Sequence, residues 1–550
     1  MAFGIYLENK KFPWQIIRQD NFSIWIKGNI LINNSILKND EIIQISHELV
    51  NEEKNEDILL SLNGSYSLVI ETPEKILAVV DRLRSIPLFY YQKDDDFVIS
   101  DDANYLREKF SPSFNEEAGA EFLVTGYVTG NETLFKYIYQ IRAGEYFIYN
   151  KSDGSLKTYY YHRYLHGNYL SEPDEVLLSR LDDIMLRVFQ RLIDTAEGEQ
   201  LVVPLSGGLD SRIIVAMLKR LGVKDVICFS YGRKGNYEAE ISRQVAEAVG
   251  YQWYFIEYTK EKMYNWYNSD EMKEYSDYAG NLTSLPHIQD YFAVKELKEK
   301  GLISEKAVFV PGHSGDMLAG SWIPDDSSSK LDNYNRFFEY IIKRHYSLWN
   351  WNVMANKEFE SVFQTKINRS INNIHISDFD DFVNAMELFN FNERQAKFIV
   401  NSVRVYEHYN YRWWLPFWDN ELIDFFRKVS LKERINCRLY HLYVTDILFT
   451  NDLSNLCHIF CSTPFSPPKQ FTDKINLFLK SIQNRYLIRS VYDRNSLFVR
   501  NFFSTDRIFK NPFLNNFFTN IIENDKRLIK MLNIYQQNGL LTYNYLTKKL

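Results

Sequence analysis

The length, composition and charge of the chain exclude several classes of protein. Its 550 residues are 45% hydrophobic and include only 22 glycines and 14 prolines, so neither a disordered nor a collagen-like chain is expected. The formal net charge of −7 disfavours a protein whose main partner is nucleic acid, because such domains carry a basic excess, and no stretch approaches the roughly 18 consecutive apolar residues of a membrane-spanning helix.

Residues 1–165 have the pattern of a compact antiparallel domain. Turn-forming residues separate short β-branched and aromatic runs at Asn63-Gly64, at Asp94 to Asp96 and at Asp153-Gly154. The expected strands are FSIWIKGNILI, SYSLVIET, KILAVV, PLFYY and EYFIYN. Helices are expected only near residues 41–53 and 115–125.

A helix near residue 171 opens the second part of the chain. Ser171-Glu172-Pro173-Asp174 offers an N-cap, an early proline and an acidic residue, all of which favour a helix start. Apolar residues then recur at helical spacing, which predicts one buried face: Leu177, Leu178, Leu181, Ile184, Met185, Val188, Phe189 and Leu192.

The following segments alternate between strand and helix. After the strand LVVPL we expect a helix over Ser211–Leu221, the strand VICFS, the helix YEAEISRQVAEAV ending at Gly250, the strand YFIEY and, at 307–311, the buried strand AVFVP. This order predicts a parallel sheet covered by helices on both faces, in a domain over residues 171–470. Residues 471–550 are expected to form a helical extension whose aromatic side chains pack on that domain.

The loop Ser206-Gly207-Gly208-Leu209-Asp210-Ser211 joins the first of these strands to its helix. Two glycines let a bulky anion approach the backbone, and the start of the helix presents free N–H groups, so the loop suits a phosphate. Asp210 would repel phosphate unless a divalent cation lay between them. The alternative is a glycine-rich turn with a purely structural role.

A second polar loop, Gly312-His313-Ser314-Gly315-Asp316, follows the strand AVFVP. Ligands of open parallel sheets bind outside the carboxyl ends of the strands. Both loops leave strands at that edge, so Asp210 and Asp316 are expected to share one or two magnesium ions.

These motifs resemble the asparagine synthetase family within the PP-loop ATP pyrophosphatases. LVVPLSGGLDSRIIVAML resembles the family's pyrophosphate loop, CFSYG the strand that lines adenine and ribose, VPGHSGDMLAGS the SGEGSDE segment, and RWWLPFWDNELIDFF the R-x-PFLD-x-EL segment. Upstream, NGSYSLVI, VVDRLRSIPLFYY (compare RDxxGxxPLYY) and FLVTGYVTGNETLFKYIYQIRAGEYF resemble the family's amino-terminal domain.

The resemblance implies an Ntn-hydrolase-like glutaminase domain followed by a synthetase domain. It implies that ATP, with magnesium, activates a carboxylate as an acyl-adenylate and that ammonia or an amine then forms an amide. The implied ATP contacts are Leu205, Ser206, Gly207, Gly208, Asp210, Ser211, Ser230, Gly232 and Gly312, and the implied magnesium ligands are Asp210 and Asp316.

The amino-terminal domain departs from the family pattern. A glutaminase of this family needs a cysteine directly after the initiator Met, so that its thiol is the nucleophile and its own amino group the base. Ala2 stands there, no cysteine precedes Cys228, and of the glutamine-binding motifs only a loose match at Gly28-Asn29 is found. We therefore expect a domain that keeps this fold and has lost glutamine hydrolysis.

The synthetase motifs depart as well. His313 and Met317 replace two glutamates of the second segment, and Ser462 stands where the catalytic lysine of a K-x-x-F motif is expected. Lys469 is a candidate substitute for that lysine. His313 is a candidate to orient phosphate or act as a base towards the amine, or else it only bonds the backbone.

The four cysteines give no metal or disulfide framework. Cys228 lies inside a predicted strand and is expected to be a core residue, while Cys457, His458 and Cys461 lack a second ligand pair for zinc. The start of the sequence has no secretory h-region, so a cytoplasmic protein is expected.

Two functions from different classes remain open on the sequence. The first is an ATP-dependent carbon–nitrogen ligase that forms AMP and pyrophosphate and acts on a small-molecule or peptide carboxylate, like the β-lactam synthetases, lasso-peptide cyclases or polysaccharide-pathway members of the family. An aspartate-amidating enzyme that takes ammonia from another source belongs to the same class. The second is a non-catalytic nucleotide-binding or scaffold protein. No nucleic acid is expected as a partner, and the sequence leaves the oligomeric state open.

Overall fold

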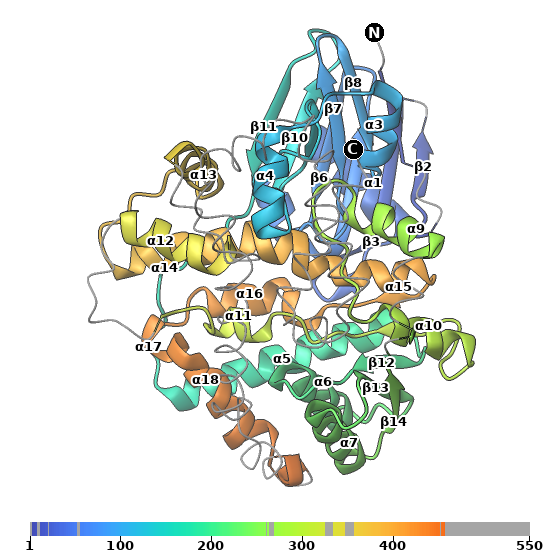
Figure 1. Cartoon of the computed structure of the whole chain (residues 1–550), viewed down its shortest axis with the longest axis vertical. Helices are drawn as coiled ribbons and strands as arrows, with labels where there is room; N and C mark the ends of the chain where they lie inside the picture. The colour runs from blue at the N-terminus through green and yellow to red at the C-terminus, as the bar shows by residue number, and fades with distance from the viewer. Residues whose placement is uncertain are drawn as a thin grey trace, which may run out of the picture.

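The computed structural model describes residues 3–7, 11–19, 21–51, 55–259, 261–262, 269–324, 334–346, 357–450 and 453–456. Figure 1 shows antiparallel sheets from the first third of the chain at one end, a parallel sheet at the other end, and a layer of helices between them. No helix within the described ranges combines the length and the apolar character that crossing a bilayer requires.

Two sheets that face each other form the N-terminal sandwich, which spans residues 3–160. The smaller sheet has the order β1-β8-β7-β9, and the larger has the order β11-β10-β6-β5-β3-β2, with β4 paired to β3. Neighbouring strands are antiparallel, except that β1 and β8 run parallel. The strands are β1 Phe3–Tyr6, β2 Gln15–Gln19, β3 Phe22–Ile32, β4 Ser35–Ile36, β5 Asn63–Glu71, β6 Lys75–Val80, β7 Phe89–Lys93, β8 Asp96–Ser100, β9 Ile138–Gln140, β10 Glu145–Asn150 and β11 Leu156–Tyr160.

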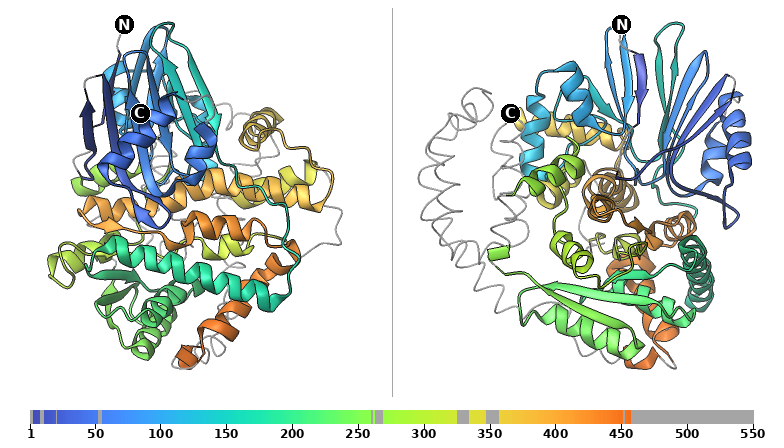
Figure 2. Two further views of the ribbon diagram at one scale, coloured as in Figure 1. Left: turned by 180° about the vertical axis from the view of Figure 1, so that it is seen from behind. Right: turned by 90° about the vertical axis from the view of Figure 1, so that its right-hand side faces the viewer.

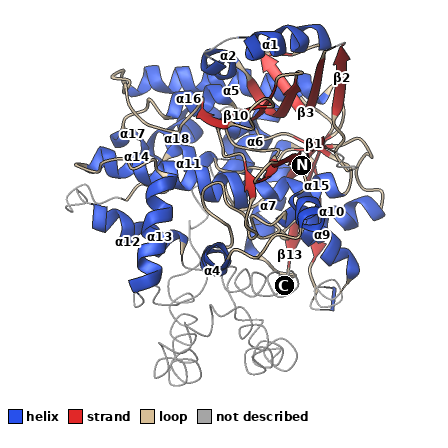
Figure 3. Ribbon diagram, turned by 90° about the horizontal axis from the view of Figure 1, so that it is seen from above, coloured by secondary structure: helices blue, strands red, loops and turns tan. Residues whose placement is uncertain are grey.

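Helices cover the outer faces of this sandwich. The core between the two sheets includes Val69, Ala78, Phe97, Ile99 and Phe147. Helices α1 (Asn39–Asn51) and α2 (Asn55–Ser61) lie on the larger sheet (Figures 2 and 3), and α3 (Ala103–Phe110) packs on β7 and β8. Helix α4 (Glu116–Thr125) follows α3. The predicted Ntn-hydrolase-like sandwich is therefore confirmed.

The third sheet is entirely parallel, with the order β14-β13-β12-β15-β16. Its strands are β12 Leu201–Pro204, β13 Val226–Gly232, β14 Gln252–Glu257, β15 Val308–Phe309 and β16 Arg412–Trp413. Helices α6 (Leu209–Arg220) and α7 (Tyr237–Val249) precede strands on one side of β12, and α10 (Tyr291–Glu299) precedes β15 on the other. Right-handed crossovers in opposite directions put these helices on opposite faces of the sheet, which confirms the predicted parallel-sheet domain.

The layer between the two ends is helical. The helices α14, η2, η3 and α15 follow one another without a break from Phe379 to His408 and run across the middle of the molecule (Figure 1). Further helices of the described residues, in this layer and beside the parallel sheet, are α9 Asp270–Gly280, α11 Gly315–Ala319, α12 Tyr334–His345, α13 Lys357–Ser370, α14 Phe379–Phe389, the π-helix η2 Asn390–Ile399, the 3₁₀-helix η3 Val400–Val403, α15 Arg404–His408, η4 Pro416–Trp418, α16 Asn420–Phe426, α17 Leu431–Arg434, η5 Ile435–Cys437, α18 Arg438–Leu442 and η6 Tyr443–Leu448.

Helix α5 (Asp174–Ala196) connects the N-terminal sandwich to the parallel sheet. Every apolar residue of its predicted stripe is buried. Its start differs from the prediction, because Pro173, not Ser171, is the N-cap, and no side chain caps the first turn. Asp174 and Glu175 in that turn complement the positive end of the helix dipole instead.

A buried ion pair joins α5 to the segment around α16. Arg191 donates from Nε and Nη2 to both carboxylate oxygens of Asp419, each at 2.8 Å, and both side chains are at least 95% buried. Asn63, the first residue of β5, donates to the same carboxylate at 3.0 Å. One buried carboxylate thus ties the sandwich, α5 and α16 together.

Replacing Arg191 by Met should lower the free energy of unfolding by about 3–5 kcal/mol, because the buried charge of Asp419 would lose its partner. Urea unfolding followed by circular dichroism measures the change. Arg187→Met is the matched control. Arg187 lies on the same helix and pairs with Glu421, but the Arg187 side chain is 44% exposed, so loss of this ion pair should cost at most about 1 kcal/mol. Equal losses in the two variants would contradict this account.

Candidate functional site

The two polar loops singled out in the sequence leave adjacent strands of the parallel sheet. β12 pairs with β15 in the register Leu201↔Val308 and Val202↔Phe309, and the chain progresses from β12 towards β14 in one direction and from β15 towards β16 in the other. The loops after β12 and β15 therefore flank the point where the strand order reverses. In open parallel sheets, ligands bind in the crevice at this point.

The loops touch each other through glycines. A Cβ on Gly312 would lie 2.7 Å from the backbone N of Ser211, and a Cβ on Gly315 would lie 2.9 Å from Cγ of Asp210. The backbone N–H of Asp316 donates to Oδ2 of Asp210 at 3.2 Å. The structure therefore brings Asp210 and Asp316 together, although 106 residues separate them in the chain.

Asp210 has an unusual environment for a carboxyl group. Burial raises its pKa to about 8, and the negative charge of Asp316 contributes to the same shift. Tyr440, on α18, donates from its hydroxyl to Oδ1 of Asp210 at 3.0 Å. The ionised form of Asp210 thus needs a nearby positive charge to be stable at neutral pH.

The donor set at this position fits magnesium together with a phosphate. Carboxylate oxygens are the ligands that magnesium prefers, and it commonly takes one or two of them while substrate phosphates and water complete its shell. Asp316 is exposed, and its Oδ2 accepts a hydrogen bond from Ser321 at 2.9 Å. The described parts of the chain contain no group of three or more His, Cys, Asp or Glu side chains that could hold a metal ion. A magnesium ion at Asp210 and Asp316 would therefore need phosphate and water as further ligands.

The hydroxyl groups of Ser206 and Ser211 close the first loop on itself. Their Oγ atoms lie 3.2 Å apart, and the backbone N–H of Gly208 donates to Oγ of Ser206 at 3.0 Å. Ser206 and Gly208 are exposed, and Gly208 is the N-cap of α6. The loop thus presents its backbone to solvent at the positive end of a helix dipole, as a phosphate site requires.

A buried arginine lies under this loop. Arg212 donates from Nη2 to the carbonyl of Gly207 at 2.6 Å, and its Nε and Nη1 have no hydrogen-bond partner among the residues that the structure describes. Its positive charge adds to the attraction of the loop for an anion.

Leu205 and Ser230 lie at the base of the loop. Ser230 donates to the carbonyl of Leu205 at 2.5 Å and accepts from Nε1 of Trp253 at 3.1 Å, while Ser242 donates to the same carbonyl at 2.8 Å. Gly232 ends β13 with φ of +136°, and its carbonyl accepts from the N–H of Tyr258. These hydrogen bonds hold the loop and the strand ends in place. A direct contact of Leu205, Ser230 or Gly232 with a nucleotide remains a prediction.

His313 lies in the second loop and bonds to the helical layer. Its Nε2 is 2.6 Å from Oγ of Ser402, on η3. Burial and the neighbouring His287 lower the pKa of His313 to about 4. The ring is therefore neutral at physiological pH.

Several predicted residues lie outside the described residues, namely Ala2, Cys457, His458, Cys461, Ser462, Lys469 and the extension 471–550. Cys228 is buried in β13, and burial raises the pKa of its thiol to about 12, in agreement with a core residue. Sequence reasoning missed Tyr440, Arg212 and Ser402. Arg212 had a signal, since it directly follows the loop, whereas Tyr440 and Ser402 had none, because they reach the site from distant helices.

Two family models match the chain. The asparagine synthase model matches residues 195–440, and the glutamine amidotransferase domain model matches residues 48–160. No curated protein sequence gives a match.

Solved structures overlap with the chain only loosely. Glutamine phosphoribosylpyrophosphate amidotransferase from B. subtilis, complexed with ADP and GMP, is 14% identical over 56% of this chain and 59% of that one, with a TM-score of 0.18. A structure of the allosteric regulatory enzyme of purine biosynthesis is 14% identical over 55% of this chain and 58% of that one, also with a TM-score of 0.18. This chain thus spans less than two thirds of either protein, and neither overlap transfers a site or an activity.

Gly312→Ala should force the two loops apart, because its Cβ would meet the backbone of Ser211 at 2.7 Å. Overpacking of this kind costs about 1–3 kcal/mol, which a lower unfolding midpoint in urea would report. Gly208→Ala is the control, since its Cβ would meet only the side chain of Ser206 at 3.1 Å. If both variants lost the same stability, the close approach of the loops would be wrong.

Proposed function

Because the chain belongs to the asparagine synthetase family, we propose that it is a magnesium-dependent ligase that adenylates a carboxylate with ATP and joins it to ammonia or a bound amine, without hydrolysing glutamine. Its asparagine synthase domain is that of an ATP-dependent amide-forming ligase. The single observation that supports magnesium-dependent adenylation is the contact of Asp210 with the loop of Asp316, beside an exposed glycine-rich helix start.

The proposed reaction has two steps. A carboxylate oxygen of the substrate attacks the α-phosphorus of ATP and pyrophosphate leaves; the amine then attacks the acyl carbon and AMP leaves. The loop from Ser206 to Ser211 and the charge of Arg212 would hold the phosphates of ATP. Asp210 and Asp316 would hold magnesium, which neutralises charge on the departing pyrophosphate.

His313 suits a hydrogen-bonding role better than a proton-accepting one. A base with a pKa of about 4 is weak at neutral pH, whereas a neutral imidazole fixed by Ser402 can orient the acceptor or the substrate carboxylate. Lys469 remains the proposed cation for the amide-forming step.

The proposal keeps the division into residues 1–165, 171–470 and 471–550. The first domain would retain its sandwich for docking rather than for glutamine chemistry, because residues 1–227 contain no cysteine that could act as the nucleophile. The amine would then come from solution or from a bound partner molecule.

Asp210→Ala and Asp316→Ala should each weaken magnesium-dependent ATP binding at least about tenfold, because each removes one of the two carboxylates that would hold the ion. Isothermal titration calorimetry with ATP, in magnesium and in EDTA, measures the effect. Asp225→Ala is the matched control, because Asp225 is exposed and precedes β13 at the opposite edge of the same sheet.

Unchanged affinities in both loop variants would contradict the site assignment. Carboxylate-dependent exchange of pyrophosphate into ATP then separates a ligase from a non-catalytic nucleotide-binding protein of the same fold. Exchange that the Asp210→Ala variant loses supports the ligase, whereas ATP binding without exchange in a broad set of carboxylates supports the nucleotide-binding protein.

The purified chain should release no glutamate from glutamine above the rate of a heat-inactivated sample, with or without ATP. A coupled glutamate dehydrogenase assay measures the release. ATP-stimulated glutamate production would show that the first domain still hydrolyses glutamine and would overturn this part of the proposal.

A further inference from the structure

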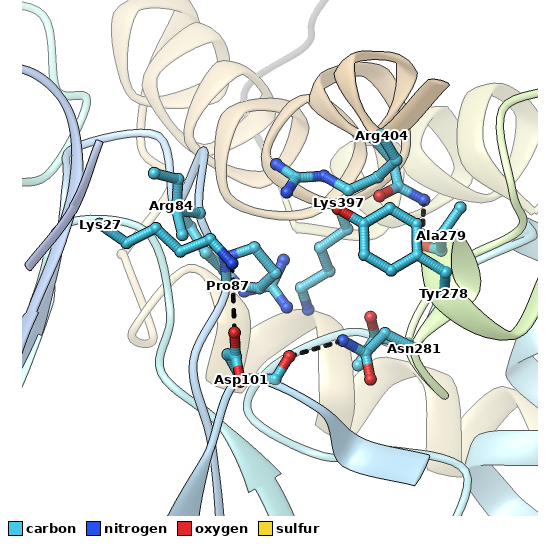
Figure 4. A pocket seen from close by; sticks show the side chains of 12 residues that line it. Lys27, Arg84, Pro87, Asp101, Tyr278, Ala279, Asn281, Lys397 and Arg404 are labelled. Carbon is cyan, nitrogen blue, oxygen red and sulfur yellow. Dashed lines mark hydrogen bonds and ion pairs between the residues drawn. The ribbon is translucent and has the colours of Figure 1, made fainter. Parts of the chain in front are cut away.

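A small cavity lies between the N-terminal sandwich and the helical layer, away from the two loops of the candidate site. Its volume is about 20 Å³, more than the roughly 10–15 Å³ that one water molecule needs. Four cationic side chains line it, and Figure 4 shows the charged ends of Lys27, Arg84 and Lys397 converging on its middle, with Arg404 beside them.

Three of these four cations have a carboxylate partner. Lys27 pairs with Asp101 at 3.2 Å, Lys397 with Glu393 at 2.5 Å and Arg404 with Glu407 at 2.6 Å. In each pair both side chains are at least 94% buried. These pairs therefore balance their own charges.

Arg84 has no carboxylate partner among the described residues. It is 97% buried, and among the described residues its side chain makes one hydrogen bond, from Nη1 to the carbonyl of Ala396 at 3.3 Å. Its Nε and Nη2 are buried and have no partner in the described parts of the chain. These two nitrogens form one complete edge of the guanidinium group, the edge that binds two oxygens of a carboxylate or phosphate side by side.

The charge of Arg84 persists in this environment. Burial and the neighbouring Arg404 lower its pKa to about 9, while the charges of Glu393 and Asp81 oppose the shift, so the group remains protonated at neutral pH. An unpaired buried cation of this kind is strongly destabilising unless a counter-charge is present. The guanidinium group of Arg84 thus offers the cavity an unused donor pair.

The backbone at Arg84 is also held in an unfavourable conformation. Its φ is +59°, in the left-handed region that glycine tolerates and other residues rarely adopt. Such strain persists only where the surroundings impose it, and it is frequent at binding sites. Here it aims a guanidinium group into the cavity, where a glycine would have removed both the strain and the charge.

We propose that this cavity binds a small oxyanion through the Nε and Nη2 edge of Arg84. The free nitrogen of Arg404, its Nε, lies in the same lining and adds a further donor. Inorganic phosphate shares the same oxygen chemistry, and the test below separates it from a carboxylate. The inference does not depend on the proposed ligase activity.

The site would act as a clamp between two parts of the chain. Arg84 and Lys27 belong to the sandwich, whereas Lys397 and Arg404 belong to the continuous helical run of the middle layer. An anion between them would give Arg84 the directly paired counter-charge that the other three cations already have. Its binding should therefore stabilise the folded chain.

The test is thermal unfolding of the full chain in formate, acetate, inorganic phosphate or chloride at one fixed ionic strength, with dissociation constants measured by calorimetry. Formate or acetate should raise the unfolding midpoint saturably, by about 2 °C or more, because a ligand that binds only the folded state stabilises it. A saturable effect of phosphate alone would identify phosphate as the oxyanion. An equal effect of chloride, or no saturable effect of any oxyanion, would overturn the proposal.

Two variants assign the effect to Arg84. Arg84→Met removes the charge and keeps much of the length, and Arg84→Gly also relieves the positive φ, so at least the latter should fold. Both should bind the oxyanion at least about tenfold more weakly, while Arg107→Met, an arginine of α3 outside the cavity, should retain the wild-type affinity. Wild-type affinity in both Arg84 variants would overturn the proposal.

The result is separable from the ligase proposal. Asp210→Ala lies in the other site and should keep the full oxyanion response. If Asp210→Ala loses ATP binding but keeps the oxyanion response, both the ATP site and the oxyanion cavity are supported. If Asp210→Ala loses the oxyanion response, the cavity is not independent of the ATP site.

Discussion

The contact between the carboxylate of Asp210 and the backbone of Asp316, at one edge of the parallel sheet, is the constraint on which the rest of the candidate site depends. Parallel pairing of β12 with β15 delivers both loops to the same point, and Gly312 and Gly315 let their backbones come within contact. The price is a buried Asp210 whose pKa rises to about 8 beside Asp316. Because burial is the larger cause of this shift and the charge of Asp316 adds to it, a bound cation would stabilise the ionised form of Asp210.

The sequence predicted the parts of this site that follow from local pattern. Alternating strands and helices predicted the parallel sheet, and a parallel sheet sends all its carboxyl-terminal loops to one edge, so the shared edge of the two loops followed from local pattern. Their direct contact did not, because it also depends on the pairing of β12 with β15. The start of α5 was misplaced, since Ser171 looks like a cap but Pro173 takes that position. Tyr440 could not be found in this way, because α18 reaches Asp210 from 230 residues away.

The charged cavity could not be predicted from the sequence either. Lys27, Arg84, Lys397 and Arg404 come from segments that no periodic pattern connects, and a buried ion pair cannot be told from a surface charge by residue type alone. One signal was present in VVDRLRSIPLFYY, where Arg84 occupies the position of the glycine in the motif RDxxGxxPLYY. A non-glycine residue at a position where the family has glycine indicates a strained backbone conformation. The φ of +59° at Arg84 agrees with this.

The continuous helical run from Phe379 to His408 lies between the two sites and contacts both. On one side, Gln395 accepts a hydrogen bond from Ser314 and Ser402 bonds His313, so this run holds the second loop. On the other side, Lys397, Asn401 and Arg404 line the charged cavity. Its central stretch is a π-helix, a geometry that is costly and concentrated at functional positions. Residues one or two positions apart on this run therefore contact different sites, so one helical element positions His313 and also lines the cavity.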